Sequence, residues 1–336
     1  MNKYKITQII CYFIVGLVFL GLGIWFMNRI GPHIGSGFRI ENLRGTFNEV
    51  GSYDLSITDI KDIDIDWISG GVSVTPYDGT VIKLVEYAQR DLKEDEVLTY
   101  EVEGSKLIVK FYDKSTGLHL FMPSKKLQVM VPESLANNLE DFLLNNVSSE
   151  IEVSNITAKT VKIDSISGSI DMTDIYSDSI KLETTSGKIL LTNSEATESS
   201  LESISGSVNI NNVISKDQMS VDTTSGSISL EAVTSDNLSL ETISGRVTAD
   251  GNFENIIGGS TSGAFKIEDG VAPKSFNIHS ISGSVTIAMP SLESMELKHS
   301  SVSGKFSCDF PIVENGGGGD YKISTTSGSI RVEKLN

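Results

Sequence analysis

Acidic residues recur at one position in five successive segments of this 336-residue chain. Each lies four residues before a glycine: Asp164, Glu183, Glu202, Asp222 and Glu241. If the segments stack in register, these carboxylates form a column in which like charges repel unless water, lysines or bound cations screen them. Three interpretations remain open. The column is a solvated face partly paired with Lys162, Lys181 and Lys188, a binding surface for divalent cations or a cationic peptide, or a pair of catalytic carboxylates of the β-helix glycosidase type.

Other reactive residue types give weaker signals. The histidines, His33, His119, His279 and His299, have no spacing suited to a zinc site or a catalytic triad. Cys308 falls at an inward position of a strand pattern, which favours a buried, inert thiol. A glycosidase would also need aromatic side chains to hold sugar rings, and the column region has aromatics at apolar core positions alone. The sequence therefore predicts no enzyme activity and no cofactor, and it leaves metal binding undetermined.

Nine Ser-Gly pairs in residues 149–336 define the positions of these acids. Most of their glycines are 19 or 20 residues apart, and the full range of spacings is 18 to 24. The glycines are Gly168, Gly187, Gly206, Gly226, Gly245, Gly263, Gly283, Gly304 and Gly328. A period near 20 residues is typical of a stacked array in which each unit buries its apolar face against its neighbours.

Apolar residues alternate with polar ones on both sides of each glycine. In the first unit Val161 and Ile163 precede Gly168, and Ile170 and Met172 follow it. A spacing of two predicts strands with one buried face, and the change of phase at the glycine requires a bend. Glycine adopts backbone angles that other residues resist, and the preceding serine can bond backbone groups with its hydroxyl. Each Ser-Gly pair is therefore predicted to be a structural corner rather than a catalytic site.

These features predict an all-β fold, a parallel β-solenoid (β-helix) of 19–20-residue repeats. A β-propeller is the less favoured alternative, because its blades need about twice this length. Two residues before the glycine, isoleucine and threonine alternate through the first seven units. That alternation leaves open a coil of 38 residues with two corners, although one repeat of 19 residues per coil is favoured.

Upstream of the repeats the pattern changes. Gly70 and Ser149 occupy the glycine position of degenerate units, and alternating segments lie between them. We expect antiparallel strands within residues 81–131, with a hairpin turn at Gly104, and a short helix after Pro132. This module is expected to cover the first exposed edge of the solenoid.

An apolar run from Ile9 to Met27 follows Lys3 and Lys5 and precedes Arg29. It is long enough to cross about 30 Å of hydrocarbon as a helix. The excess of positive charge before the run predicts a single-pass protein of the cell membrane with a cytoplasmic N-terminus and an extracellular C-terminal domain. A cleaved signal peptide is the alternative, but the run is longer than usual and has no small-residue cleavage site before Arg29.

The chain is thus predicted to contain four parts. They are a cytoplasmic tail and transmembrane anchor (1–29), a stalk (30–56), an N-terminal β module (57–148) and the Ser-Gly repeat solenoid (149–336). The part after residue 40 has 23 basic and 44 acidic residues, a net charge of −21. Such acidity argues against nucleic acid or anionic lipid as partners and favours cationic ones, although it also keeps an extracellular protein soluble.

Several motifs resemble one known family. They are the opening "IDIDWISGGVSV", the strands "LIVKF" and "LQVMVP", and the repeated "SISGSI" and "TTSGSI". From about Ile57 to its end, the chain resembles the bacterial DUF4097 family of β-strand-repeat proteins, also labelled adhesins, some of which are linked to cell-envelope stress systems of the Lia type. That family has no agreed chemical activity, so the resemblance implies a surface or envelope protein and supplies no catalytic residues.

The sequence therefore predicts a membrane-anchored, extracytoplasmic protein of the cell envelope that acts by binding or scaffolding, without catalysis. Its expected partners are the membrane, through one helix, and a cell-wall, cationic-peptide or protein partner. One alternative is an acidic surface that sequesters divalent cations or cationic peptides. Another is a carbohydrate-active β-helix enzyme.

Overall fold

The computed structural model describes residues 39–40, 46–112, 121–314 and 319–335 of the chain. The predicted anchor (1–29) and about half of the predicted stalk (30–56) lie outside these residues, whereas Asn48–Ser56 at the end of the predicted stalk form strand β2. Within the described part, no helix has the length and apolar character needed to span a membrane.

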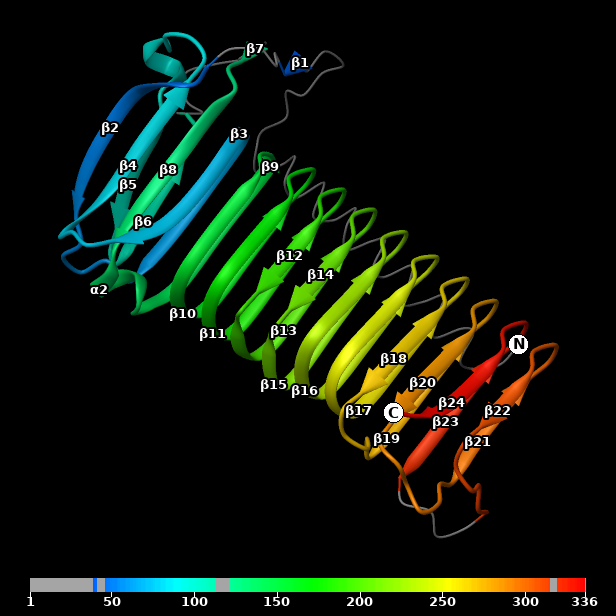
Figure 1. The fold of residues 1–336 in the computed structure, drawn as a ribbon. Coiled ribbons are helices and arrows are strands. Elements are labelled where there is room, and N and C mark those ends of the chain that lie inside the picture. The colour runs from blue at the N-terminus through cyan, green and yellow to red at the C-terminus, as the bar shows by residue number, and fades with distance from the viewer. Residues whose placement is uncertain (1–38, 41–45, 113–120, 315–318, 336) are drawn as a thin grey trace.

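The body of the molecule is a parallel β-solenoid of about ten turns (Figure 1). Strand β10 pairs in parallel with β11 at a constant offset of 19 residues, from Ile151 opposite Ile170 to Ser165 opposite Thr184. One repeat therefore forms one coil, which confirms the favoured prediction over a 38-residue coil. The strands of this region are β9 (Leu139–Ser148), β10 (Ile151–Ser165), β11 (Ile170–Thr184), β12 (Ile189–Thr192), β13 (Glu195–Ser203), β14 (Val208–Asn211), β15 (Ile214–Thr223), β16 (Ile228–Thr242), β17 (Val247–Ser260), β18 (Phe265–Asp269), β19 (Ser275–Ser280) and β20 (Val285–Met289).

The predicted inward positions form the core. Val161, Ile163, Ile170 and Met172 are at most 1% exposed, and their equivalents in later coils pack against them. Stacking at the strand spacing of about 4.8 Å therefore buries apolar columns that run through successive coils.

A second corner, which the sequence analysis did not predict, follows six residues after each glycine position. Its residue has a φ angle of 49° to 56° in five successive coils, at Asn155, Asp174, Asn193, Asn212 and Ala232. Asn and Asp tolerate this left-handed region better than most residues. The buried face of β10 changes phase once more between Ala158 and Val161, so the coil bends a third time and has three sides. The third side is the strand segment that leads into the Ser-Gly corner.

The corner glycines are required by close approach rather than by a left-handed backbone. A Cβ atom on Gly187 would lie 1.9 Å from the carbonyl oxygen of Gly168, and one on Gly206 would lie 1.7 Å from that of Gly187. The same distance is 1.7 to 2.0 Å at all nine corners, and none of these glycines has a left-handed φ angle. The expectation of unusual backbone angles at these positions was therefore wrong, although the chain does turn there.

The hydroxyl of the corner also comes from a different residue than predicted. The Gly187 N–H donates to Thr184 Oγ1 at 3.1 Å, and the Thr184 hydroxyl donates to the Gly168 carbonyl of the preceding coil at 3.3 Å. Ser186, directly before Gly187, is exposed. In general the buried Ser or Thr three residues before the glycine stabilises the turn, although the Ser244 hydroxyl does donate to the Thr224 carbonyl, at 3.4 Å.

The last two coils are interleaved rather than placed in chain order. Strands β23 (Asp320–Thr325) and β24 (Ile330–Lys334) lie between β19–β20 on one side and β21 (Leu297–Ser301) and β22 (Phe306–Cys308) on the other (Figure 1). The chain forms the outermost coil first and then returns to fill the position that it passed. The C-terminal strands thus have neighbours on both sides, which opposes fraying.

The N-terminal end is interleaved in the same way. Strand β3 (Asp62–Tyr77) lies between β6 (Lys106–Lys110) and β8 (Lys125–Pro132) on one side and β9 and β10 on the other. Strand β4 (Val81–Ala88) pairs antiparallel with both β8 and β2 (Asn48–Ser56), and β5 (Thr99–Glu103) pairs antiparallel with β6. The expected antiparallel strands are present, except that β6 and β8 also pair in parallel with β3.

The remaining elements are short. Strands β1 (Arg39–Ile40) and β7 (Phe121–Met122) pair with each other, and a 3-10 helix, η1, spans Glu94–Glu96. The helix expected after Pro132 is a single turn, α2 (Glu133–Ala136), before β9 begins at Leu139.

We expect Gly226→Val to destabilise the protein by about 3 kcal/mol, because its Cβ would lie 1.8 Å from the Gly206 carbonyl oxygen. Urea denaturation measures the change. The control is Ser225→Val, which places the same side chain on the neighbouring exposed residue and should cost less than about 1 kcal/mol. Equal losses for the two variants would contradict the close-approach argument.

Candidate functional site

The structure brings all five predicted acids together on the outward face of the third side. Asp164, Glu183, Glu202, Asp222 and Glu241 lie directly opposite one another on consecutive strands. We call this row the acidic column. Its neighbouring backbones are about 4.8 Å apart, so adjacent carboxylates are close enough to interact.

Lysines neutralise the first two members of the acidic column. Lys162 Nζ lies 2.7 Å from Asp164 Oδ2, and Lys181 Nζ lies 2.6 Å from Glu183 Oε1. Each lysine is two residues before its acid and therefore on the same face of the strand. Among the described residues, Lys188 makes no ion pair with the column.

The next three acids, Glu202, Asp222 and Glu241, have no lysine partner among the described residues. A serine stands two residues before each of them: Ser200, Ser220 and Ser239. The Ser220 hydroxyl and Asp222 Oδ2 are 3.1 Å apart, within hydrogen-bond distance. The loss of the lysine therefore leaves three successive half-buried carboxylates with little compensation.

Burial raises the pKa of all three carboxyl groups. The pKa of Glu202 rises to about 7, with the charges of Glu183 and Asp222 adding to the effect of burial. Burial raises the pKa of Asp222 to about 6, against the opposing hydrogen bond from Ser220. The pKa of Glu241 rises to about 7 through burial and the charge of Asp222. These three carboxyl groups consequently change their protonation state near neutral pH. A bound cation would lower their pKa values.

Beyond Glu241 the same row continues over four more coils with Gly259, His279, Ser324 and Ser300. The Glu241 carboxylate lies across the space beside Gly259, because a Cβ on Gly259 would be 2.2 Å from Glu241 Oε2. His279 Nδ1 and Ser324 Oγ are 2.8 Å apart. The missing side chain at Gly259 thus opens the face next to the last acid of the column.

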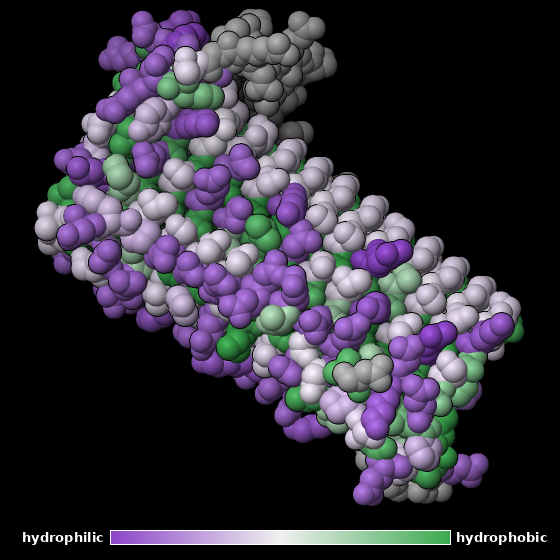
Figure 2. Space-filling model, viewed as in Figure 1, coloured by the Kyte–Doolittle hydropathy of each residue, from purple (hydrophilic) through white to green (hydrophobic). Residues whose placement is uncertain are grey.

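A surface groove of about 900 Å³ lies over this part of the face. Besides Glu241 and His279, its lining includes the neighbouring outward row of Ile257, Lys322 and Lys298. This volume is within the range of ligand-binding clefts. In the view of Figure 2 the molecule is mostly hydrophilic, with apolar residues reaching the surface in separate patches. The groove was not predicted from the sequence, although the Gly258–Gly259 pair within a strand was a signal for it.

The other reactive residues that the structure describes, His299 and Cys308, do not form a second site, and His299 is part of the groove lining. The ring of His299 stacks on Phe306 at a centroid distance of 3.5 Å in the outermost coil. Cys308 is half-buried rather than buried, and burial raises the pKa of its thiol. His33 and His119 lie outside the described residues. Across the four described ranges, no group of three or more His, Cys, Asp or Glu is placed to hold a metal ion.

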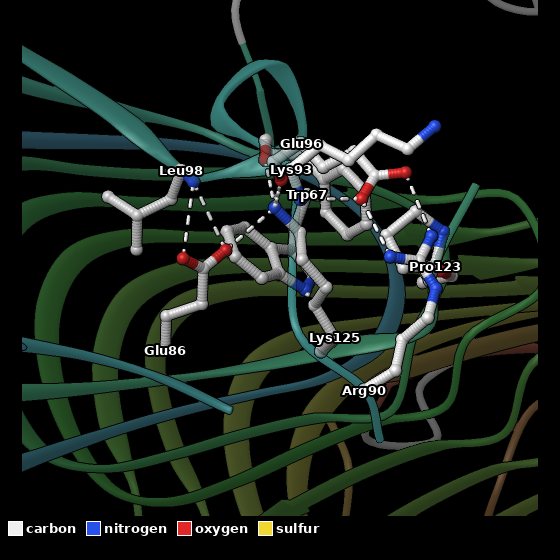
Figure 3. Close-up of polar contacts among 10 residues, drawn as sticks. Trp67, Glu86, Arg90, Lys93, Glu96, Leu98, Pro123 and Lys125 are labelled. Carbon is white, nitrogen blue, oxygen red and sulfur yellow. Dashed lines mark hydrogen bonds and ion pairs between the residues drawn. The ribbon is translucent and has the colours of Figure 1, made fainter. Parts of the chain in front are cut away.

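The N-terminal module contains a buried charged cluster that was not predicted from the sequence (Figure 3). Lys125 and Glu86 are both fully buried, and Lys125 Nζ lies 2.7 Å from Glu86 Oε1. The same ammonium group donates to the carbonyls of Glu96, at 2.6 Å, and of Phe111, and it lies 5.3 Å from the ring centre of Trp67. Burial lowers the pKa of Lys125 to about 8, against the opposing charge of Glu86.

Around this cluster, two hydrogen bonds from Arg90, at 2.7 and 2.8 Å, lower the pKa of Glu96 to about 2. The Leu98 N–H donates to Glu86 at 3.1 Å. Perturbed pKa values often mark functional sites. Because Lys125 and Glu86 have no exposed surface, we interpret this cluster as structural: it ties the segment between β4 and β5 to β8.

We expect Lys125→Met to destabilise the protein by about 3 to 5 kcal/mol, because the buried Glu86 charge would lose its partner. Adding Glu86→Gln should recover part of that loss, since the uncompensated charge is then absent. Chemical denaturation of the two variants provides the measurement. A double variant that is less stable than Lys125→Met would contradict the charge argument.

The pH dependence of stability follows from the raised pKa values of the acidic column. Unfolded Asp and Glu titrate near pH 4, so between about pH 4 and 7 the folded protein binds more protons than the unfolded chain at these sites. Their contribution therefore stabilises the fold at low pH and is lost as the pH rises through 6 to 7. The melting temperature of a Glu202→Gln, Asp222→Asn, Glu241→Gln variant, relative to that of the unmodified protein, should rise between pH 5 and 8. A constant difference would contradict the assignment.

Several solved structures match this chain over most of its length, and they share little sequence with it. A protein called a putative adhesin from Parabacteroides distasonis ATCC 8503 aligns with a TM-score of 0.49 and 11% identity, over 87% of this chain and 98% of that one. A protein called a putative lipid binding protein from the same organism aligns with a TM-score of 0.40 and 17% identity, over 87% and 98%. A putative adhesin from Bacteroides fragilis NCTC 9343 aligns with a TM-score of 0.35 and 12% identity, over 84% and 96%.

No curated protein is similar to this chain in sequence. In contrast, the family model described as Toastrack DUF4097 matches residues 60–251 and 214–333. These matches span most of the solenoid and its N-terminal module, in agreement with the resemblance inferred from the Ser-Gly repeats. The chain therefore belongs to the Toastrack DUF4097 family.

Proposed function

We propose that this chain is a membrane-anchored, extracytoplasmic binding or scaffold protein of the bacterial cell envelope that acts without catalysis. Its binding surface is the outward third side of the coils from Glu202 to Ser300, which contains the last three acids of the column and the groove. We call this surface the binding face. The partner that its chemistry fits is a cationic polypeptide.

The observation that carries this proposal is a row of three carboxylates without lysine partners among the described residues, the last of which, Glu241, lines a groove of about 900 Å³. Glu202, Asp222 and Glu241 lose hydration without gaining an ion pair among the described residues. A lysine or arginine side chain of a partner would supply charge-assisted hydrogen bonds and favour the ionised form of each acid. Binding would thus offset the free-energy penalty of half-burying these carboxylates without an ion pair.

Several features favour a polypeptide over a single metal ion. Each coil contributes one carboxylate to the acidic column, at steps of about 4.8 Å, so several cationic side chains on one chain can each contact an acid. A calcium site would need six to eight oxygen ligands around one point. No group of three or more His, Cys, Asp or Glu in the described part of the chain offers the start of such a site.

The lining of the groove also favours binding over glycoside hydrolysis. Glycosidases position a sugar between an acid and a second carboxylate, and their clefts hold sugar rings with aromatic side chains. The groove is lined by Glu241 together with Ile257, His279, lysines and small residues, and it includes no Trp, Tyr or Phe among the described residues. A rigid stack of coils with a charged face suits recognition of an extended partner.

The location of the protein is part of the proposal. The apolar run Ile9–Met27 supports a single membrane helix, with the short tail in the cytoplasm and the solenoid outside. The net charge of −21 after residue 40 supports an extracellular partner that is cationic.

We expect the full chain to remain in the membrane pellet after carbonate extraction of cells and to be released by detergent, because the apolar run stays attached. Immunoblotting of the fractions with an antibody against the solenoid measures this. The control is a variant without residues 1–28 expressed with a cleavable secretion signal, which should appear in the medium. Recovery of the unmodified protein mainly as a shortened chain in the medium would contradict anchoring.

We expect detergent-solubilised protein to bind oligolysine, and the triple variant Glu202→Gln, Asp222→Asn, Glu241→Gln to bind it at least about tenfold more weakly. Titration calorimetry at low and high salt provides the measurement, and the affinity should fall with salt. The matched control is Glu152→Gln, Asp217→Asn, Glu231→Gln, which removes the same charge from exposed positions off the binding face. Equal weakening by both triple variants would show that net charge alone attracts the peptide.

A further inference from the structure

We propose that one partner of the binding face is a second copy of this chain, docked face to face about a two-fold axis. The axis passes through the coil of Gly259, parallel to its strands. This inference rests on the proposed function, because it uses the same face and the same acids. The cationic groups come here from Lys298 and Lys322 of the second copy, although that copy is acidic as a whole.

The order of residues along the binding face gives the basis for this symmetry. Seven outward residues lie in register on successive coils, each paired with the next: Glu202, Asp222, Glu241, Gly259, His279, Ser324 and Ser300. Gly259 is the middle residue, with three coils on either side. The half before Gly259 holds the three carboxylates without lysine partners, and the half after it holds a histidine and two hydroxyls.

Lysines stand beside the hydroxyls of that second half. Lys322 and Lys298 lie two residues before Ser324 and Ser300, and therefore on the same outward face of adjacent strands. They take the row that serines occupy in the acidic half. The binding face thus has an acidic half and a half that carries cations.

A two-fold axis through the middle coil brings opposite halves together. It places the coil of Glu202 opposite the partner's coil with Lys298, and the coil of Asp222 opposite the partner's coil with Lys322. By the same rotation Glu241 faces the partner's His279. Each contact occurs twice, as required for an isologous dimer, and the acids of the column do not face one another.

Lys322 and Lys298 can bind carboxylates of the second copy in addition to their present partners. Lys322 Nζ lies 2.7 Å from Asp320 Oδ2, and Lys298 Nζ lies 3.5 Å from Glu296 Oε1. The two lysine side chains remain 45% and 64% exposed, and exposed pairs of this kind contribute at most about 1 kcal/mol. An ammonium group has three donors, so a partner carboxylate can be added to the existing contact.

The centre of the face suits apolar contact. Ile257 is 55% exposed, more than most large apolar side chains of the described residues, and it lies on the middle coil directly before Gly258 and Gly259. The two-fold axis places Ile257 opposite Ile257 of the second copy. Because Gly258 and Gly259 have no side chains, the two faces can approach closely there. An apolar centre with a charged rim is the usual anatomy of a protein interface.

Six steps of about 4.8 Å make the face about 29 Å long. One sheet face of this length is smaller than the interface of an obligate dimer, so the association is expected to be reversible. Anchoring both copies in one membrane would raise their effective concentration.

The test uses the full chain in native membranes. In a background of Cys11→Ser and Cys308→Ala, the Ile257→Cys variant should form a disulfide-linked dimer on mild oxidation, because residue 257 lies near the axis. The matched control is Ile214→Cys, where the isoleucine is 45% exposed on another side of the coil. Non-reducing electrophoresis should show at least about fivefold more dimer for Ile257→Cys. A yield equal to that of the control would overturn the proposal.

Charge reversal tests the symmetry in the same assay. Adding Lys298→Glu and Lys322→Glu, or Glu202→Lys and Asp222→Lys, to the Ile257→Cys chain should reduce its self-linked dimer severalfold, because like charges would then face each other. Two differently tagged chains, one with each pair of changes, should link to each other at the original level when co-expressed. Protease resistance of each variant reports on folding. Linking that is insensitive to charge reversal would overturn the proposal.

The outcome is separable from that of the proposed function. A protein that binds oligolysine through its three acids but does not link through the Ile257→Cys variant keeps the proposed function and overturns this inference. A protein that links in the charge-dependent way but does not bind oligolysine keeps the self-association and overturns the general cationic partner.

Discussion

Every coil of this protein depends on one close contact. At each Ser-Gly corner, the carbonyl oxygen of one coil occupies space that a Cβ atom of the next would need, within 1.7 to 2.0 Å. A buried hydroxyl three residues earlier bonds the glycine N–H, as Ser203 does for Gly206. The glycine column therefore holds successive coils in register, and that register aligns the apolar residues in the core and the acids outside.

The two ends of a stack in this register would expose unpaired strand edges. In this fold the terminal strands are interleaved with their neighbours instead. In both terminal regions the chain builds an outer coil and places another segment between it and the body, β3 at one end and β23–β24 at the other. Antiparallel strands β2 and β4 extend the N-terminal edge further. Strands that would fray alone are thus paired on both sides, which protects a structure whose coils are stabilised mainly by their neighbours.

Buried charges have partners in the N-terminal module, whereas the half-buried carboxylates of the binding face lack an ion pair among the described residues. The ammonium group of the buried Lys125 contacts Glu86, backbone carbonyls and aromatic rings. These contacts within the fold offset the desolvation penalty of its charge. On the binding face, Glu202 and Glu241 receive no such compensation among the described residues, and their pKa values rise to about 7. A structural charge has its partners within the fold, whereas a binding residue keeps its carboxylate unpaired until a partner contacts it. This contrast supports placing the binding surface on the solenoid rather than in the N-terminal module.

The sequence by itself determined the all-β class and the apolar positions of the strands, because alternation of period two is read along the chain. It favoured one repeat per coil and hence the stacking of Asp164 to Glu241, and the pairing of β10 with β11 excluded a coil of two repeats. Only the tertiary structure decided the reason for glycine at the corners, the left-handed second corner, the partner of Lys125 and the groove beyond Glu241. It also decided the order of the last coils. The repeats are so alike that many pairings satisfy the same local pattern, and the choice among them depends on contacts between segments far apart in the chain.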